Sequence, residues 1–149
     1  MAASSRRTGL NVTAYTDASF SDRGGWAIWL RSERGRIVRH GSCPETVTDA
    51  LLAELWAIKE ALRIAVESWP ETETVLINSD CLAATNALES RNYFKREEAA
   101  VLQEDILAFA FAKYLTLRFK HVKGHTGSND VRSYLNRRCD LMSRRARGA

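Results

Sequence analysis

Cysteine is scarce in this chain of 149 residues, which has three, at positions 43, 81 and 139, and no Cys-x-x-Cys pair. An odd number without close pairs argues against a disulfide framework and against a zinc knuckle. It fits a reducing compartment, so we expect a cytoplasmic protein. The chain also lacks any run of about 18 apolar residues, and it therefore predicts no membrane span.

The N-terminal segment lacks the apolar stretch of a signal peptide, although it contains Arg6 and Arg7. We expect residues 1–10 to form a flexible arm and residues 11–147 to form a single domain, because no linker, repeat or low-complexity segment interrupts them. The net charge of +4 and the pI near 9.2 are compatible with a nucleic-acid partner. Many soluble proteins are equally basic, so charge alone does not decide the partner.

Proline and glycine are few, with two and eight residues, and they separate two kinds of pattern. Up to Cys43, alternating or apolar segments between glycine-containing turns predict an antiparallel meander. Residues 48–68 contain neither glycine nor proline and carry apolar residues at helical spacing, with Thr48 or Asp49 as cap and Pro70 as the stop. The predicted strands are residues 11–19, 25–30, 36–43, 73–79 and 114–122, and the predicted helices are 48–68, 81–88, 97–112 and 131–146.

The resulting order is β-β-β-α-β-α-α-β-α. A meander followed by βαβ units favours one five-stranded mixed sheet flanked by helices, in the α/β class.

Four acids lie where such a fold can bring side chains together. Asp17 and Asp80 end the first and fourth strands, Glu54 lies beside the apolar stripe of the first helix, and Asp140 lies in the last helix. Strands one and four are the natural central pair, and sites in open α/β sheets form at the carboxyl ends of strands. Neighbouring carboxylates repel unless a cation neutralises them, and oxygen ligands suit Mg²⁺ or Mn²⁺. Each acid alone fits a turn, cap or solvated position, so the indication of a two-metal site for phosphodiester cleavage comes from their combination.

Five segments resemble the type 1 ribonuclease H family, in their residues and in their order. They are YTDAS around Asp17, LLAELWAI around Glu54, INSDCLAA around Asp80, HVKGHTG around His125 and NRRCDLMSRRA around Asp140. The resemblance spans nearly the whole chain. It implies the ribonuclease H fold and hydrolysis of the RNA strand of RNA–DNA hybrids, which leaves 5′-phosphate and 3′-hydroxyl ends. It also implies that the four acids hold two Mg²⁺ ions, with Mn²⁺ as a substitute, and that His125 is a mobile proton-transfer residue.

The chain departs from the family pattern mainly where substrate would be recognised. The loop after Asp17 is short, and Asp49-Ala50 stands near the polar pair that reads 2′-hydroxyl groups in many members. The basic protrusion of many bacterial members is reduced to residues 91–96, which interleave bases and aromatics or simply form a solvated turn. The candidate substrate contacts are Ser19, Arg23, Thr48, Ser79, Lys95 and Arg96.

The histidines differ in their setting. His125 lies between two glycines, and its spacing to Asp140 is longer than is common in the family. His121 is expected to be an ordinary strand residue.

Two other functions stay open. One is a DNA recombinase or integrase-type nuclease with the same acids, against which the KGHTG segment argues. The other is a module that binds hybrids or proteins without cutting, against which the complete set of four acids argues. On the favoured interpretation the partner is an RNA–DNA hybrid, no membrane or small-molecule cofactor takes part, and the protein acts as a monomer.

Overall fold

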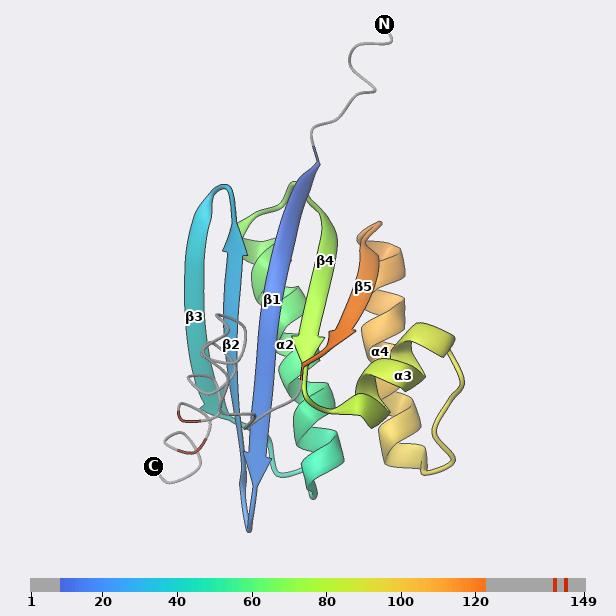
Figure 1. The fold of residues 1–149 in the computed structure, drawn as a ribbon. Coiled ribbons are helices and arrows are strands. Elements are labelled where there is room, and N and C mark those ends of the chain that lie inside the picture. The colour runs from blue at the N-terminus through green and yellow to red at the C-terminus, as the bar shows by residue number, and fades with distance from the viewer. Residues whose placement is uncertain (1–8, 123–140, 142–143, 145–149) are drawn as a thin grey trace, which may run out of the picture.

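The computed structural model describes residues 9–122, 141 and 144; the remaining residues lie outside the described part. Five strands form one sheet in the order β3-β2-β1-β4-β5 (Figure 1). β1 (Leu10–Phe20), β2 (Gly24–Ser32) and β3 (Gly35–Ser42) form the antiparallel meander. β4 (Thr72–Ser79) and β5 (Thr116–His121) extend the sheet in parallel with β1. The predicted five-stranded mixed sheet is thus confirmed.

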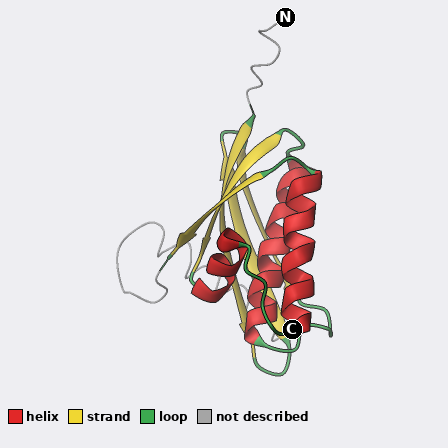
Figure 2. Ribbon diagram, turned by 90° about the vertical axis from the view of Figure 1, so that its right-hand side faces the viewer, coloured by secondary structure: helices red, strands yellow, loops and turns green. Residues whose placement is uncertain are grey.

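Three described helices lie on one face of this sheet, as Figure 2 shows most clearly. They are α2 (Ala50–Ser68), α3 (Leu82–Ser90) and α4 (Glu97–Ala112). None of these described helices has the length and apolar character needed to cross a bilayer.

Helix α2 is the main partner of the sheet, and its sequence explains why. Its first turn is capped by Asp49, whose Oδ1 accepts a hydrogen bond from the Leu52 backbone N–H at 2.9 Å. Leu55, Ile58 and Leu62 recur at helical spacing and are fully buried in the core that α2 forms with β1 and β2. Truncating one of them to alanine should cost about 2–5 kcal/mol. The helix carries Glu54 toward the sheet, so this packing determines where that carboxylate lies.

The connection between α3 and α4 is held to the core by one buried side chain. Gln103 of α4 is fully buried, and its Nε2 donates to the carbonyl oxygens of Ala87 at 3.0 Å and Asn92 at 3.1 Å. Its Oε1 accepts from the Phe94 backbone N–H at 3.1 Å. One amide therefore satisfies the Asn92 carbonyl and the Phe94 N–H of the turn and ties both to the end of α3.

Element boundaries differ from the predictions at a few ends, for local reasons. β5 begins at Thr116 and not at Tyr114, because Tyr114 has a φ of 57° and its N–H donates to the Phe111 carbonyl in a turn that continues α4. Of the predicted last helix, Leu141 and Arg144 are described and are helical.

Candidate metal centre and substrate groove

Strand register brings Asp17 and Asp80 to the same level of the sheet. β1 and β4 are parallel, and Tyr15 is paired with Asn78. Asp17 lies two residues after Tyr15, near the end of β1. Asp80 lies two residues after Asn78, directly after β4. The prediction that strands one and four are neighbours is confirmed.

Helix α2 supplies the third carboxylate. One oxygen from each of Asp17, Glu54 and Asp80 lies within 4.8 Å of the other two. Asp17 is only 3% exposed, and its Oδ1 accepts a hydrogen bond from the Ala18 backbone N–H at 2.9 Å. Three carboxylates this close together, one of them buried, form the oxygen-rich set that hard divalent cations prefer.

Two cysteine thiols have raised pKa values, to which the negative charge of this cluster contributes. Burial, as the main cause, and the charges of Glu54 and Asp80 raise the pKa of the Cys81 thiol to about 11. Burial, followed by the charges of Glu60 and Glu54, raises the pKa of the Cys43 thiol to about 12. Both cysteines are therefore neutral thiols near pH 7.

Two hydrogen bonds at the end of β4 hold the segment that carries Asp80. The fully buried Asn78 donates from Nδ2 to the Ala14 carbonyl oxygen of β1 at 3.2 Å. Ser79 is also fully buried, and its Oγ accepts from the Cys81 backbone N–H at 3.0 Å. Ser79 thus supports the turn at Asp80, and its burial does not favour the predicted substrate contact.

His121 lies closer to the cluster than its sequence setting suggested. It ends β5 opposite Ser79, and its Nε2 is 3.2 Å from the backbone carbonyl oxygen of Asp80. The signal that could have found it is its place at the end of a strand beside β4. A contact to the Asp80 backbone makes it a support for that turn.

A groove of about 580 Å³ runs between the β1–β2 turn and the connection from β3 to α2. It is lined by residues 20–24 and 43–45 together with Val47 and Thr48. The structure thereby brings Arg23 and Thr48, two candidate substrate contacts, to one groove. Ser19 lies half-buried near the end of β1 that leads into it.

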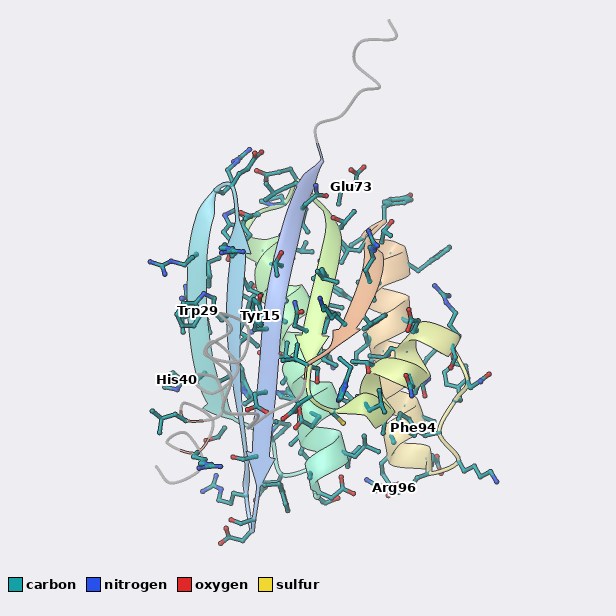
Figure 3. The ribbon with its side chains drawn as sticks, viewed as in Figure 1. Tyr15, Trp29, His40, Glu73, Phe94 and Arg96 are labelled. Carbon is teal, nitrogen blue, oxygen red and sulfur yellow. The ribbon has the colours of Figure 1, made fainter. Side chains whose placement is uncertain are left out.

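The remaining two candidates, Lys95 and Arg96, end the α3–α4 connection, and Figure 3 shows Arg96 there. Lys95 is exposed. The Nη1 of Arg96 donates to Oδ2 of Asp49, the residue that caps α2. Sequence reasoning missed this ion pair, because the two residues are far apart in the chain and nothing local indicates that they meet.

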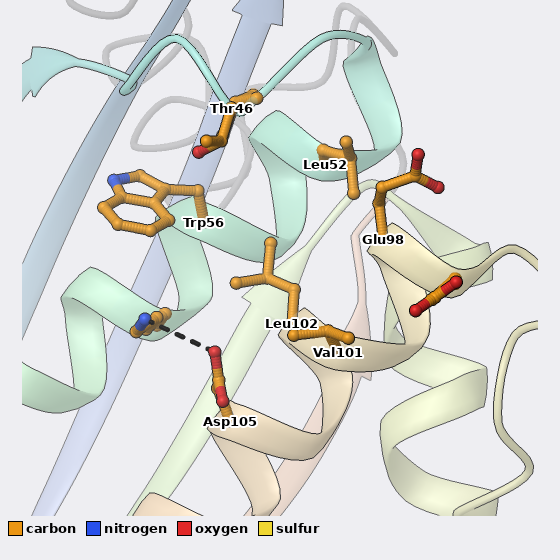
Figure 4. A pocket seen from close by; sticks show the side chains of 10 residues that line it. Thr46, Leu52, Trp56, Glu98, Val101, Leu102 and Asp105 are labelled. Atoms are coloured by element: carbon orange, nitrogen blue, oxygen red, sulfur yellow. Dashed lines mark ion pairs between the residues drawn. The ribbon is translucent and has the colours of Figure 1, made fainter.

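A separate cavity of about 500 Å³ lies between α2 and α4 (Figure 4). Its lining includes Trp56 and Leu102, and an ion pair joins Lys59 to Asp105 at 3.7 Å on its edge. None of the clustered carboxylates and none of the candidate substrate contacts lines it, although it shares Val47 with the groove.

Two predicted site residues, His125 and Asp140, lie outside the described residues. Their roles stay predictions.

Comparison with known proteins gives consistent matches at the level of family and fold. A family model for RNase H matches residues 10–147. LC11-RNase H1, isolated from compost by a metagenomic approach, has a TM-score of 0.74 at 17% identity, over 93% of this chain and 96% of that one. Its complex with an RNA/DNA hybrid has a TM-score of 0.76 at 15% identity, over 92% and 96% of the two chains.

RNase H1 from the halophilic archaeon Halobacterium salinarum NRC-1 has a TM-score of 0.68 at 17% identity, over 91% of this chain and 96% of that one. A search of curated protein sequences found no match. Because the family model covers almost the whole chain and the fold agrees with these solved structures, the chain belongs to the RNase H family.

Proposed function

We propose that this protein is a metal-dependent endoribonuclease that hydrolyses the RNA strand of RNA–DNA hybrids. The observation that carries the proposal is the convergence of Asp17, Glu54 and Asp80, whose ligand oxygens lie within 4.8 Å of one another. Membership of the RNase H family supports the same activity. A solved relative bound to an RNA/DNA hybrid, LC11-RNase H1, supports the choice of substrate.

The donor set fits Mg²⁺, with Mn²⁺ as a substitute. All three residues offer carboxylate oxygens, and among the described residues no histidine or cysteine joins the cluster as a softer ligand. Asp17, Glu54, Asp80 and, from the sequence, Asp140 would hold two ions. When bound, such ions supply an activated water and stabilise the leaving oxygen of a phosphodiester.

The residues of the chain have distinct roles in this reaction. The three clustered carboxylates would hold the ions against which the scissile phosphate is positioned, and the buried position of Asp17 keeps its carboxylate from turning away. A water oxygen forms a bond to phosphorus, and the bond from phosphorus to the 3′-oxygen breaks. The attacking water gives up a proton and the leaving 3′-oxygen takes one up, which gives 5′-phosphate and 3′-hydroxyl ends. We assign His125 to proton transfer and product release.

The groove beside the β1–β2 turn is the proposed path of the RNA strand. Arg23 offers a cation for a backbone phosphate, and Thr48 offers a hydroxyl that can bond to a 2′-hydroxyl group. Ser19 would contribute its backbone amide near the scissile group. Lys95 is proposed to contact the opposite strand.

A cleavage assay with three labelled substrates tests this function. We expect the protein to cut an RNA–DNA hybrid in Mg²⁺ or Mn²⁺, and to leave it intact in EDTA. Cleavage of duplex DNA would favour the recombinase or integrase-type nuclease. Binding of the hybrid without cleavage by a folded protein would favour the non-catalytic module.

Variants of the cluster test the assignment of its residues. Asp17→Asn and Asp80→Asn should abolish cleavage without loss of the fold, whereas Asp105→Asn, the same chemical change on α4, should cut normally. Near-normal activity in either cluster variant contradicts the two-metal assignment. His125→Ala should slow turnover, and a complete loss would show that the histidine has a more central role.

Three further expectations belong to this proposal. Action as a monomer, independence from small-molecule cofactors and a cytoplasmic location all stay predictions, as do the domain limits of 11–147. Size-exclusion chromatography and cleavage by the purified protein with metal alone test the first two.

A further inference from the structure

The Asp49–Arg96 ion pair joins the start of α2, next to the proposed substrate groove, to the start of α4. Asp49 directly follows Thr48, which lines the groove, and it caps α2 five residues before Glu54. Five residues of helix rise correspond to about 7.5 Å along the axis. The start of the helix, where the ion pair lies, is therefore about one and a half helical turns from the level of Glu54.

Both carboxylate oxygens of Asp49 are already used within the protein. Oδ1 accepts from the Leu52 backbone N–H at 2.9 Å, and Oδ2 accepts from Nη1 of Arg96. The hydrogen bond from Arg96 is the main cause that lowers the pKa of Asp49, so the pair is charged near neutral pH.

Arg96 lies between two acids. In addition to Asp49, the carboxylate of Glu98 approaches its Nε at 3.5 Å. Two neighbouring carboxylates thus offset the charge of Arg96 and weaken its attraction for a phosphate. The side chain of Arg96 is nevertheless 44% exposed, so an external anion can reach it.

The backbone that carries Arg96 does not depend on the ion pair. Gln103 holds Asn92 and Phe94 by hydrogen bonds from the buried core. Arg96 itself caps α4, where its carbonyl oxygen accepts from the Ala100 N–H at 3.0 Å. The guanidinium group can therefore exchange one anion for another while its Cα stays in place.

We propose that Asp49 competes with a backbone phosphate of the hybrid for Arg96. Arg96 is a phosphate-binding residue whose charge Asp49 holds back, and the pair limits the affinity of the protein for its substrate. This inference rests on the proposed function, because it assumes that a hybrid occupies the groove next to Thr48.

The test compares two substitutions that remove one negative charge each. Asp49→Asn frees Arg96 and keeps an acceptor oxygen for the Leu52 N–H, since asparagine caps helices as well as aspartate does. Glu71→Gln is the matched control, because Glu71 pairs with Arg34 at 2.6 Å just before β4, at the opposite end of that strand from Asp80.

Affinity is measured by fluorescence anisotropy of a labelled RNA–DNA hybrid in EDTA, which prevents cleavage, at several KCl concentrations. Asp49→Asn should lower Kd by about three- to tenfold at low salt and steepen the slope of log K against log[salt] by roughly 0.9, as expected for one added phosphate contact. Glu71→Gln should change both quantities much less. Adding Arg96→Ala to Asp49→Asn should remove the gain, and Arg96→Ala should cost less affinity in the wild-type background than in Asp49→Asn.

Several results would overturn the inference. One is an Asp49→Asn protein that binds no tighter than Glu71→Gln; another is an Arg96→Ala protein that loses as much affinity in the wild-type background as in Asp49→Asn. Asp49→Ser, which also keeps a cap, must behave like Asp49→Asn, and unchanged melting temperatures exclude a folding effect. If the wild type cuts no hybrid in Mg²⁺, the proposed function fails; if it cuts and Asp49→Asn gains no affinity, only this inference fails.

Discussion

Replacing Asp17 by asparagine should make the metal-free protein more stable and remove its response to Mg²⁺. Asp17 is 3% exposed and lies within 4.8 Å of carboxylate oxygens of Glu54 and Asp80. At this distance, two negative charges repel by about 0.9 kcal/mol with the dielectric constant of water and by about 3.5 kcal/mol with an effective value of 20. Removing one charge relieves two such repulsions, so even water-like screening predicts a gain of about 2 kcal/mol.

The substitution should cost little elsewhere. Asparagine keeps the Oδ1 atom that accepts from the Ala18 backbone N–H at 2.9 Å, and it occupies nearly the same volume. A gain of 2 kcal/mol corresponds to a melting temperature higher by roughly 4–8 °C for a chain of this length. The wild type, in contrast, should gain about 2.7 kcal/mol at a Mg²⁺ concentration of 100 times its Kd, and Asp17→Asn should lose most of this gain.

Thermal unfolding by circular dichroism, in EDTA and in Mg²⁺, measures both effects. Asp105→Asn serves as the control, since it removes a carboxylate from a surface ion pair and should shift the melting temperature only slightly. An Asp17→Asn protein that melts at or below the wild type in EDTA would show that the carboxylates do not repel in the folded state. An unchanged Mg²⁺ response would show that Asp17 is not a ligand.

Three further predictions concern the surroundings of the site. Gln103→Leu should lower the free energy of unfolding by about 2 kcal/mol in urea titrations, because the Asn92 carbonyl and the Phe94 N–H lose the hydrogen bonds that this amide makes. A loss below about 1 kcal/mol would contradict the role given to it. Because Arg96 lowers the pKa of Asp49 in the folded state, their ion pair should stabilise the protein above the ordinary aspartate pKa, and this stabilisation should be lost as the pH falls through the folded pKa. Asp49→Asn should therefore flatten the pH dependence of the free energy of unfolding in that acid range. An unchanged profile would contradict the stabilising role of the pair. Iodoacetamide should modify Cys81 slowly at pH 8 and faster once Mg²⁺ neutralises the cluster, whereas the modification rate of Cys43 should change less. Peptide mapping by mass spectrometry measures the two rates separately. An equal rate for Cys81 with and without Mg²⁺ would contradict the proposed metal position.

Much of the fold could be predicted because its signals are local. The apolar spacing of Leu55, Ile58 and Leu62 indicates a helix with one buried face, and the structure buries that face. The acids at the ends of two strands, Asp17 and Asp80, could be expected to meet because parallel central strands end at the same edge of a sheet.

The supporting contacts could not be predicted, because they depend on which distant residues meet. Nothing in the segment around Gln103 indicates that its amide holds the α3–α4 connection. Asp49 was expected as a helix cap, but its second partner, Arg96, follows only from the packing of α4 beside α2. Ser79 illustrates the converse: its place beside Asp80 indicated a substrate contact, whereas its side chain is buried and bonded to the backbone.

The central claim is that Glu54, an acid inside an otherwise ordinary helix, belongs to a catalytic metal site with Asp17 and Asp80. The most direct measurement is the rate at which Glu54→Gln cleaves the hybrid in Mg²⁺. It is compared with the rate of Glu67→Gln, which carries the same change at an exposed position of the same helix. The account predicts that Glu54→Gln loses more than the roughly 100-fold that removal of an outer-shell partner costs, while Glu67→Gln cuts at the wild-type rate. Equal rates for the two variants would contradict it.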